Sequence, residues 1–537
     1  MLSLLLRLGG VFIAALMLVI ASAGSAEARW LRAESPRFIV YSDGDERSLR
    51  EYVQQLEVYD AILRWRHGID PGGIPQRKLE LYLVGNQRQL QAINPRISTD
   101  TLGFYWAGDT DLFGTAVRAR GDMATTFHEY AHHFMFQHFA AGYPSWLVEG
   151  YAEYFMTAEI RPNRIRIGLH NENRAYWLAN ASWMPLEVIL TRNTWEMGNS
   201  EAVAMYYAQS WALTHYFLGD AVRVRQLLAY VHNIRAGLDS VEAMETATGM
   251  TIRQLNEALQ RYVRAGIPVT VLRENTFPVP DVTVTTLPPS ADDLILLRQR
   301  LRAGWGREDD EVLGLIRQRA ARHRGDRMAE LTLASAEIMR GDRPSGQAIL
   351  SDWISAHPDD AEALQAMGWA YLLDLLDGPR GEALGTEDHA RINAQMDTAR
   401  GYLARAYQAD PDDYRTLMML STLRTGSPDF PNENDLNTLY AAFELAPQVS
   451  TVRFAYARAL LHASEYNEAI NVLLPLATDP HSRTFAAHAR GLIEQAEMAR
   501  AGLLIEWDDE IVELPLDDED APVRFPPRAH PSGAALW

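Results

Sequence analysis

Apolar positions between residues 36 and 118 follow two different spacings. The segments 36–42 (PRFIVYS) and 79–85 (LELYLVG) are rich in β-branched and aromatic residues, which predicts two strands. Between them, residues 48–68 repeat apolar side chains at helical spacing and end at a glycine, which predicts a helix. Residues 103–118 predict two more short strands around a turn at 107–111. Strands and helices therefore alternate in this part of the chain.

The apolar spacing becomes helical from Met123 to about Val263. Residues 276–290 then hold four prolines and show no helical period, so we expect a linker between two domains there. Beyond this segment the pattern is almost entirely helical. The chain is thus predicted to consist of an α+β domain followed by an all-α domain.

The helical half contains a repeat. Prolines that end predicted helices are spaced by 53, 36 and 33 residues, at Pro358, Pro411, Pro447 and Pro480. A period near 34 predicts helix pairs like those of tetratricopeptide (TPR) repeats. The longer unit carries an insert around residues 378–389, and GWAY (368–371) resembles the TPR pattern, although no unit has the full consensus. An irregular helical bundle is the alternative.

The N-terminus has the pattern of a secretory signal peptide. Arg7 precedes an apolar run from Leu8 to Ala23, and small residues follow it. We expect cleavage after Ala28, which leaves residues 1–28 as the signal peptide, because the first segment predicted to fold begins at Trp30. An uncleaved anchor helix is the alternative, although a span usually needs about 20 apolar residues. The mature protein is expected to be periplasmic or secreted, without a stable membrane span.

The amino-acid composition limits which binding partners and which metal ligands are possible. The 537 residues include 50 basic and 70 acidic side chains, a formal net charge of −20, which argues against a general binder of nucleic acid or anionic membranes. There is no cysteine, so a metal must be held by histidines and carboxylates. Nine acidic residues lie between Glu506 and Asp520, and the tail 501–537 is therefore predicted to be a solvated extension.

The candidate chemistry lies in residues 125–155. His128, Glu129 and His132 form an HExxH pattern. Residues four apart on a helix share a face, so the two imidazoles can hold one zinc ion. Glu129 can then serve as the general base toward a metal-activated water.

Two residues are candidates for the third ligand. His138 follows His132 by six residues, but Met135 stands where a helix-breaking glycine would be needed, and on a continuous helix His138 faces away. Glu149 follows His132 by 17 residues, beyond a predicted helix break, and an antiparallel second helix can bring its carboxylate to the zinc. Glu153 shares the face of Glu149, where it can accept a hydrogen bond from a ligand histidine.

HEYAH followed by WLVEGYAEYF resembles the gluzincin metallopeptidases, such as zinc aminopeptidases and thermolysin-like enzymes. With the signal peptide and the repeats, the chain is similar to exported bacterial proteins that fuse a peptidase-MA-like domain to TPR repeats. The resemblance implies a zincin-like catalytic domain over residues 29–275 and a TPR-like domain over 291–500. It also implies one zinc ion per chain, with the ligands His128, His132 and Glu149, the base Glu129 and the outer support Glu153.

Two further roles are implied only by this resemblance. Gluzincin aminopeptidases use a tyrosine to donate a hydrogen bond to the oxyanion, and Tyr207 in MYYAQS matches it, with Ser210 in place of a glycine. Whether Tyr207 or Tyr206 faces the metal stays open, and both can be packing residues. In the same class an edge strand pairs with the substrate backbone. The candidate strand, which can also be an ordinary sheet edge, consists of Leu112, Phe113, Gly114, Thr115, Ala116 and Val117.

These observations support two main hypotheses. The first is a periplasmic zinc-dependent metallopeptidase acting on proteins or peptides, whose repeats recruit a protein partner or substrate. The aminopeptidase segment G-x-M-E-N does not occur, so we expect endopeptidase-like action. The alternative is an envelope TPR scaffold or adaptor whose peptidase-like domain is inactive or weakly active. Zinc hydrolysis of a non-peptide substrate, such as a cell-wall component, is a third possibility.

Overall fold

The structure is a computed structural model of the chain. It describes residues 30–75, 77–98, 101–108, 111–118, 123–139, 141–273, 277–304, 310–377, 386–478 and 483–503. The predicted signal peptide, Pro480, most of the predicted insert at 378–389 and nearly all of the acidic tail lie outside these ranges.

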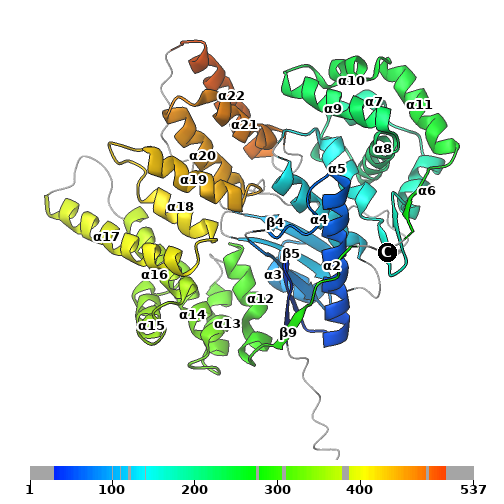
Figure 1. Cartoon of the computed structure of the whole chain (residues 1–537). Helices are drawn as coiled ribbons and strands as arrows, with labels where there is room; N and C mark the ends of the chain where they lie inside the picture. The colour runs from blue at the N-terminus through cyan, green and yellow to red at the C-terminus, as the bar shows by residue number, and fades with distance from the viewer. Residues whose placement is uncertain are drawn as a thin grey trace, which may run out of the picture.

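A six-stranded mixed sheet forms the centre of the N-terminal half (Figure 1). Its strand order is β4-β5-β3-β2-β1-β9. β2, β3 and β5 run parallel to one another, whereas β1, β4 and β9 each pair antiparallel with their neighbours. The strands are β1 (Leu31–Glu34), β2 (Phe38–Ser42), β3 (Leu79–Val84), β4 (Gly103–Ala107), β5 (Leu112–Val117) and β9 (Thr283–Thr286). The strands predicted at 36–42 and 79–85 and the predicted hairpin at 103–118 are confirmed.

Helices cover both faces of this sheet. Because side chains alternate along a strand, Leu81 and Leu83 of β3 face one side and Tyr82 faces the other. Leu81 and Leu83 join the core formed with α2 (Glu46–Arg66) and α4 (Ala124–His138). Tyr82 packs in a second core with α3 (Gln87–Ile93) and α12 (Ser290–Arg302). The helix predicted at 48–68 is confirmed as α2.

A helical lobe follows α4 and is shown in green and cyan in Figure 1. It contains α5 (Ser145–Phe155), α6 (Glu172–Asn180), α7 (Leu186–Thr191), α8 (Ser200–Leu218), α9 (Ala221–Arg235), α10 (Ser240–Thr248) and α11 (Ile252–Arg264). The expectation of helices from Met123 to Val263 was wrong at one place, where β6 (Glu159–Arg161) and β7 (Arg164–Ile167) form a hairpin that β8 (Thr270–Leu272) extends. The sequence RIRI alternates in the period of a strand, and its two isoleucines are buried.

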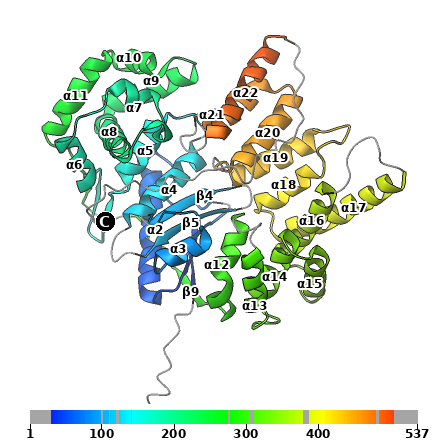
Figure 2. The ribbon, with the colours of Figure 1, turned by 180° about the vertical axis from the view of Figure 1, so that it is seen from behind.

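The C-terminal half is an array of helices, each packed on the next along the chain. Its arc is visible from both sides in Figures 1 and 2. The helices after α12 are α13 (Asp310–Ala320), α14 (Arg327–Met339), α15 (Arg343–Ala356), α16 (Ala361–Leu376), α17 (Thr386–Ala409), α18 (Tyr414–Thr422), α19 (Glu433–Leu445), α20 (Ser450–His462), α21 (Tyr466–Ala477) and α22 (Arg483–Arg500). α15, α17 and α19 end just before Pro358, Pro411 and Pro447, which confirms these prolines as helix ends. This half is thus a helical repeat array, as the proline spacing predicts.

The predicted linker at 276–290 was a wrong interpretation. Its residues Thr283–Thr286 form β9, which pairs with β1 and completes the sheet. The prolines flank this strand instead of excluding it, since an edge strand needs only one side of its backbone for pairing. α12, which was assigned to the repeats, covers the sheet together with α3. The segment that connects the two halves is therefore packed in and against the sheet, and it is not a separate linker.

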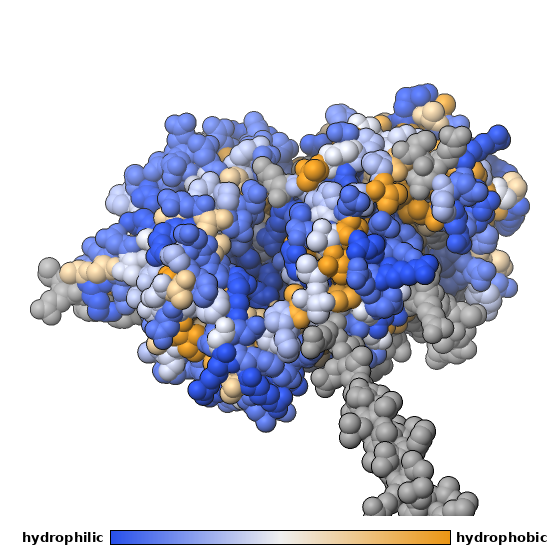
Figure 3. Space-filling view, turned by 60° about the horizontal axis from the view of Figure 1, so that its bottom comes forward, coloured by the Kyte–Doolittle hydropathy of each residue, from blue (hydrophilic) through white to orange (hydrophobic). Residues whose placement is uncertain are grey.

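The two halves also share a core. Tyr414, Leu417, Leu445 and Val449 of the repeats belong to the same buried cluster as α2 and α4. The Tyr414 hydroxyl donates a hydrogen bond to the Gly108 carbonyl, which directly follows β4. The face shown in Figure 3 is mainly hydrophilic, with apolar residues in several small groups. Within the described ranges, no helix has the length and apolar character required to cross a membrane.

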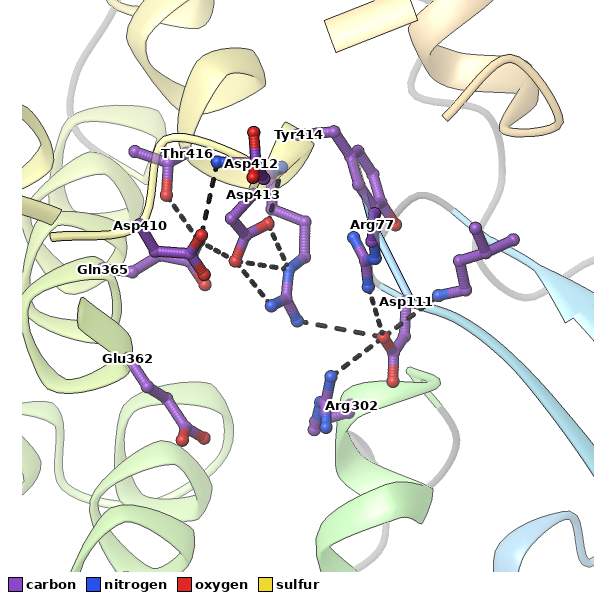
Figure 4. Close-up of polar contacts among 12 residues, drawn as sticks. Arg77, Asp111, Arg302, Glu362, Gln365, Asp410, Asp412, Asp413, Tyr414 and Thr416 are labelled. Carbon is purple, nitrogen blue, oxygen red and sulfur yellow. Dashed lines mark hydrogen bonds and ion pairs between the residues drawn. The ribbon is translucent and has the colours of Figure 1, made fainter. Parts of the chain in front are cut away.

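A buried carboxylate at Asp111 joins the sheet to the repeats (Figure 4). Asp111 is 1% exposed and accepts hydrogen bonds from Arg302 Nη2 at 3.0 Å and from Gln299 Nε2 at 2.8 Å. Nη atoms of Arg77 and Arg415 lie 3.8 and 3.9 Å from the same carboxylate. Burial by itself would raise the pKa of Asp111, but the three guanidinium groups hold the pKa below its usual value.

We predict that Asp111→Asn lowers the free energy of unfolding by about 3 kcal/mol, because it leaves the buried guanidinium groups without their shared counter-charge. Urea denaturation measures this loss. Asp397→Asn is the matched control, since Asp397 pairs with Arg400 on the surface at 2.8 Å and should contribute less than about 1 kcal/mol. Equal losses in the two variants would contradict the role given to Asp111.

Candidate metal centre

Two histidines of α4 and one glutamate of α5 converge on a common point. His128 Nε2 lies 3.1 Å from His132 Nε2, and Glu149 Oε2 lies 3.6 and 3.7 Å from these two nitrogens. All three residues are buried, and His132 and Glu149 are 0% exposed. The structure therefore brings the predicted ligands together from two helices.

This triangle of atoms has the dimensions of a zinc site. A tetrahedral zinc with bonds of about 2.0–2.1 Å places two of its ligand atoms about 3.3 Å apart. The three ligand atoms of His128, His132 and Glu149 all lie within 4.8 Å of one another. Two imidazoles and one carboxylate form a typical ligand set for zinc and leave the fourth position for a substrate or solvent oxygen. The residues present therefore fit a zinc ion.

The position of Glu149 depends on close contact between α5 and α8. Gly150 lies against α8, where a Cβ would collide with the Thr214 side chain and the Ser210 carbonyl. Every residue of α5 is buried, so the helix is held on all sides. Glycine at 150 thus lets α5 approach α8, and the neighbouring Glu149 is directed at the histidines of α4.

Glu153 lies on the outer side of His128. Its Oε1 atom is 3.5 Å from His128 Nδ1, the nitrogen that does not face the ligand triangle. Arg174 of α6 donates to both carboxylate oxygens of Glu153, from Nη2 at 2.8 Å and from Nε at 2.9 Å. Glu153 therefore lies beside the outer nitrogen of His128, and its role as an outer support stays a prediction. Arg174 was missed, because an arginine inside a predicted helix carries no sign of a partner 21 residues earlier.

Glu129 follows the first histidine on α4 and is 9% exposed. It lines a small cavity between α4 and the sheet, together with Tyr52 of α2, Tyr105 of β4 and Thr115 of β5. Glu129 therefore faces the sheet, and in the chain it directly follows the candidate ligand His128.

The two tyrosines of α8 occupy different environments. The Tyr206 hydroxyl donates to the Arg192 carbonyl at 2.9 Å, and its side chain is fully buried. The Tyr207 ring lies under the Arg174 guanidinium, whose carbon is 5.1 Å from the ring centroid. Of the two tyrosines, Tyr207 is thus the one in contact with Arg174, the partner of Glu153.

The predicted substrate edge strand was wrong in its position. Residues Leu112–Val117 form β5, but β5 pairs with β3 on one side and with β4 on the other. Its backbone groups are therefore engaged in the sheet on both sides. The outermost strand at this end is β4, Gly103–Ala107, which runs antiparallel to β5. Composition alone does not reveal which strand of a hairpin lies outside, because both are buried.

The two remaining histidines of α4, His133 and His138, lie outside the ligand group. His133 Nδ1 is 2.9 Å from the Tyr105 hydroxyl and 3.4 Å from Gln448 Nε2 of the repeats. Burial, with contributions from the charges of His138 and Arg77, lowers the pKa of His133 to about 3. The His138 ring packs on Phe134. Among the described residues, the third member of the ligand group is Glu149 and not His138.

Comparisons with known proteins give limited guidance. No protein-family model matches the chain, and no curated protein matches it. Among solved structures, the chain is similar to a thermophilic TPR protein of Thermus thermophilus, at 17% sequence identity and a TM-score of 0.32. The similarity covers 38% of this chain and 99% of that chain. The helical repeat character of the C-terminal half rests on its own consecutive helix pairs.

A half-buried histidine at the C-terminal end of α2 supports α5. His67 Nε2 lies 2.9 Å from the Tyr151 hydroxyl, and its ring packs on Phe139. Burial, assisted by the positive charges of Arg66 and His138, lowers the pKa of His67 to about 4. In the unfolded chain the pKa of a histidine is about 6.5, so the unfolded state takes up a proton first as the pH falls.

We therefore predict that folding stability decreases from pH 7 to pH 5, and that His67 accounts for about 1–2 kcal/mol of this decrease. Urea denaturation at the two pH values measures it. In His67→Phe, which keeps an aromatic ring at this position, the pH dependence should be smaller by that amount. An unchanged pH dependence in the variant would show that His67 is not the titrating group.

Proposed function

We propose that the protein is an exported zinc-dependent metallopeptidase with a zincin-like N-terminal half and endopeptidase-like action on proteins or peptides. The observation that carries the proposal is the buried triangle of His128, His132 and Glu149 ligand atoms, with Glu129 next to it in the chain. The pattern HExxH on one helix and a glutamate on the next supports the same class.

When bound, the metal supplies Lewis acidity toward a water molecule and a carbonyl oxygen. Glu129 takes a proton from the attacking water on its carboxylate and delivers it to the nitrogen of the leaving amine. The Tyr207 hydroxyl donates a hydrogen bond to the oxygen of the scissile carbonyl as negative charge develops there. Glu153, whose Oε1 lies 3.5 Å from His128 Nδ1, is in position to accept from Nδ1–H and so to favour the tautomer that leaves Nε2 as the ligand atom.

We predict that the purified full chain binds about one zinc ion and that Glu129→Gln keeps this zinc while proteolysis falls about 10²–10⁴-fold. Gln preserves the size of the side chain but cannot take up the proton. Elemental analysis gives the zinc content, and cleavage of an unstructured protein such as casein gives the activity. His132→Ala should lose both zinc and activity.

Two results would refute the proposal. A wild-type protein that stays free of zinc at micromolar metal would exclude the metal centre. A Glu129→Gln variant as active as the wild type would exclude the assigned base. If zinc binds but only a cell-wall polymer is hydrolysed, the proposed zinc-dependent hydrolysis is supported and the proposed peptide substrate is refuted.

The second candidate function is a scaffold or adaptor that binds a protein partner through the repeats. The observation that favours it is the helical array from α13 to α22, an architecture that commonly presents a binding surface. Zinc-dependent activity and partner binding can be separated in the full chain. A partner retained equally by wild type and by His132→Ala, with no proteolysis by either, would support the scaffold function alone.

A further inference from the structure

Arg174 is a charged side chain enclosed within the protein beside the candidate metal centre. It is 4% exposed, and both of its bonding partners are oxygens of one carboxylate, that of Glu153. A two-pronged guanidinium–carboxylate pair fixes the plane of both groups as well as their distance. The orientation of Glu153 is therefore set by Arg174.

The same carboxylate faces a ligand histidine. Glu153 Oε1 accepts from Arg174 Nη2 at 2.8 Å and lies 3.5 Å from His128 Nδ1. A carboxylate offers about four acceptor positions, so Oε1 can accept from both groups. The guanidinium thus holds the oxygen that orients the His128 ring.

Arg174 also contacts a second element of the centre. Its guanidinium carbon lies 5.1 Å from the centroid of the Tyr207 ring, within the range of a cation–π contact. Burial by itself would lower the pKa of Arg174, but the charge of Glu153, and to a smaller extent Tyr207 and Glu149, keeps the pKa raised. Arg174 thus remains a cation between α5 and α8.

The local fold explains how Arg174 reaches this position. The Asn171 side chain caps α6 by accepting from the backbone N–H groups of Asn173 and Arg174. Trp177 and Leu178 are buried and anchor α6 on the lobe, where it packs against α8. Arg174 therefore projects from the first turn of a capped helix toward α5 and α8.

We propose that Arg174 is a positioning residue of the metal centre, which holds Glu153 against His128 and the Tyr207 ring in place. The effect on metal affinity requires only that the ligand triangle binds zinc. The effect on turnover rests on the proposed peptidase function. Arg174 itself contacts neither ligand atoms of the triangle nor a substrate in this scheme.

The test compares Arg174→Gln with the wild-type full chain. Zinc affinity is measured by competition with a chromogenic chelator, and turnover is measured at saturating zinc. We expect Arg174→Gln to bind zinc about 10–100-fold more weakly, as removal of an outer support of a ligand histidine typically does. At saturating zinc, kcat should fall while KM changes little, because Tyr207 is expected to act on the transition state.

Arg415→Gln is the matched control. Arg415 is a partly buried arginine bound to a carboxylate, Asp413, but it lies at the junction with the repeats, where its Nη1 atom is 3.9 Å from Asp111. It should lose thermal stability without losing zinc affinity. Arg174→Lys keeps the charge but not the planar fork, so it should fold and recover only part of the zinc affinity. This variant keeps the test usable if Arg174→Gln does not fold.

If the wild type binds zinc tightly and both Arg174 variants bind it equally well, the positioning role is overturned and the proposed function is unaffected. Absence of zinc binding by the wild type would overturn the proposed function itself. Loss of zinc affinity in Arg415→Gln equal to that in Arg174→Gln would assign the effect to general destabilisation and overturn the proposal.

Discussion

The arrangement of the candidate metal centre depends on the close contact between α5 and α8. Gly150 makes this contact possible, because any side chain there would collide with the Ser210 carbonyl and with Thr214. α5 carries Glu149 toward the histidines, and one turn later it carries Glu153 to the outer side of His128. A wider separation of the two helices would move both carboxylates together. The close approach of α5 to α8 at Gly150 therefore fixes the positions of both the candidate ligand Glu149 and its outer support Glu153.

The second constraint is the attachment of the repeats to this unit. The α4 helix that carries both histidines is contacted by Gln448, whose Nε2 donates to the Gln137 side chain and approaches His133. Gly142, in the turn between α4 and α5, lies so close to the Leu474 carbonyl of α21 that a Cβ there would be 2.9 Å from it. The helix pair that holds the ligands is thus supported on its outer side by the repeats. The repeat array is a structural part of the centre's surroundings and not an appendage.

The sequence predicted the local features of this protein well. HExxH indicated that His128 and His132 share a helix face, since a period of 3.6 residues requires it. The missing glycine at Met135 excluded His138 as a ligand, and the structure groups Glu149 with the histidines instead. The strands β2 to β5, the helix ends before prolines and the array of helix pairs also follow from patterns within a few residues. Each of these is determined by short-range geometry.

Longer-range features were decided by the tertiary structure. From the sequence, Thr283–Thr286 was interpreted as part of a proline-rich linker, but in the structure it pairs with β1. Likewise, β5 was interpreted as an edge strand, but β4 pairs with it on its outer side. The sequence does not reveal the role of Arg174, because only the folded chain brings it to its partner Glu153. By itself, the sequence determined that α2 and α4 are helices, which face of α4 carries the two ligand histidines and that no thiolate ligand exists. Only the tertiary structure decided which strand lies outside, how the repeats close on the sheet and which cation supports the centre, because these contacts join residues that local periodicity does not relate.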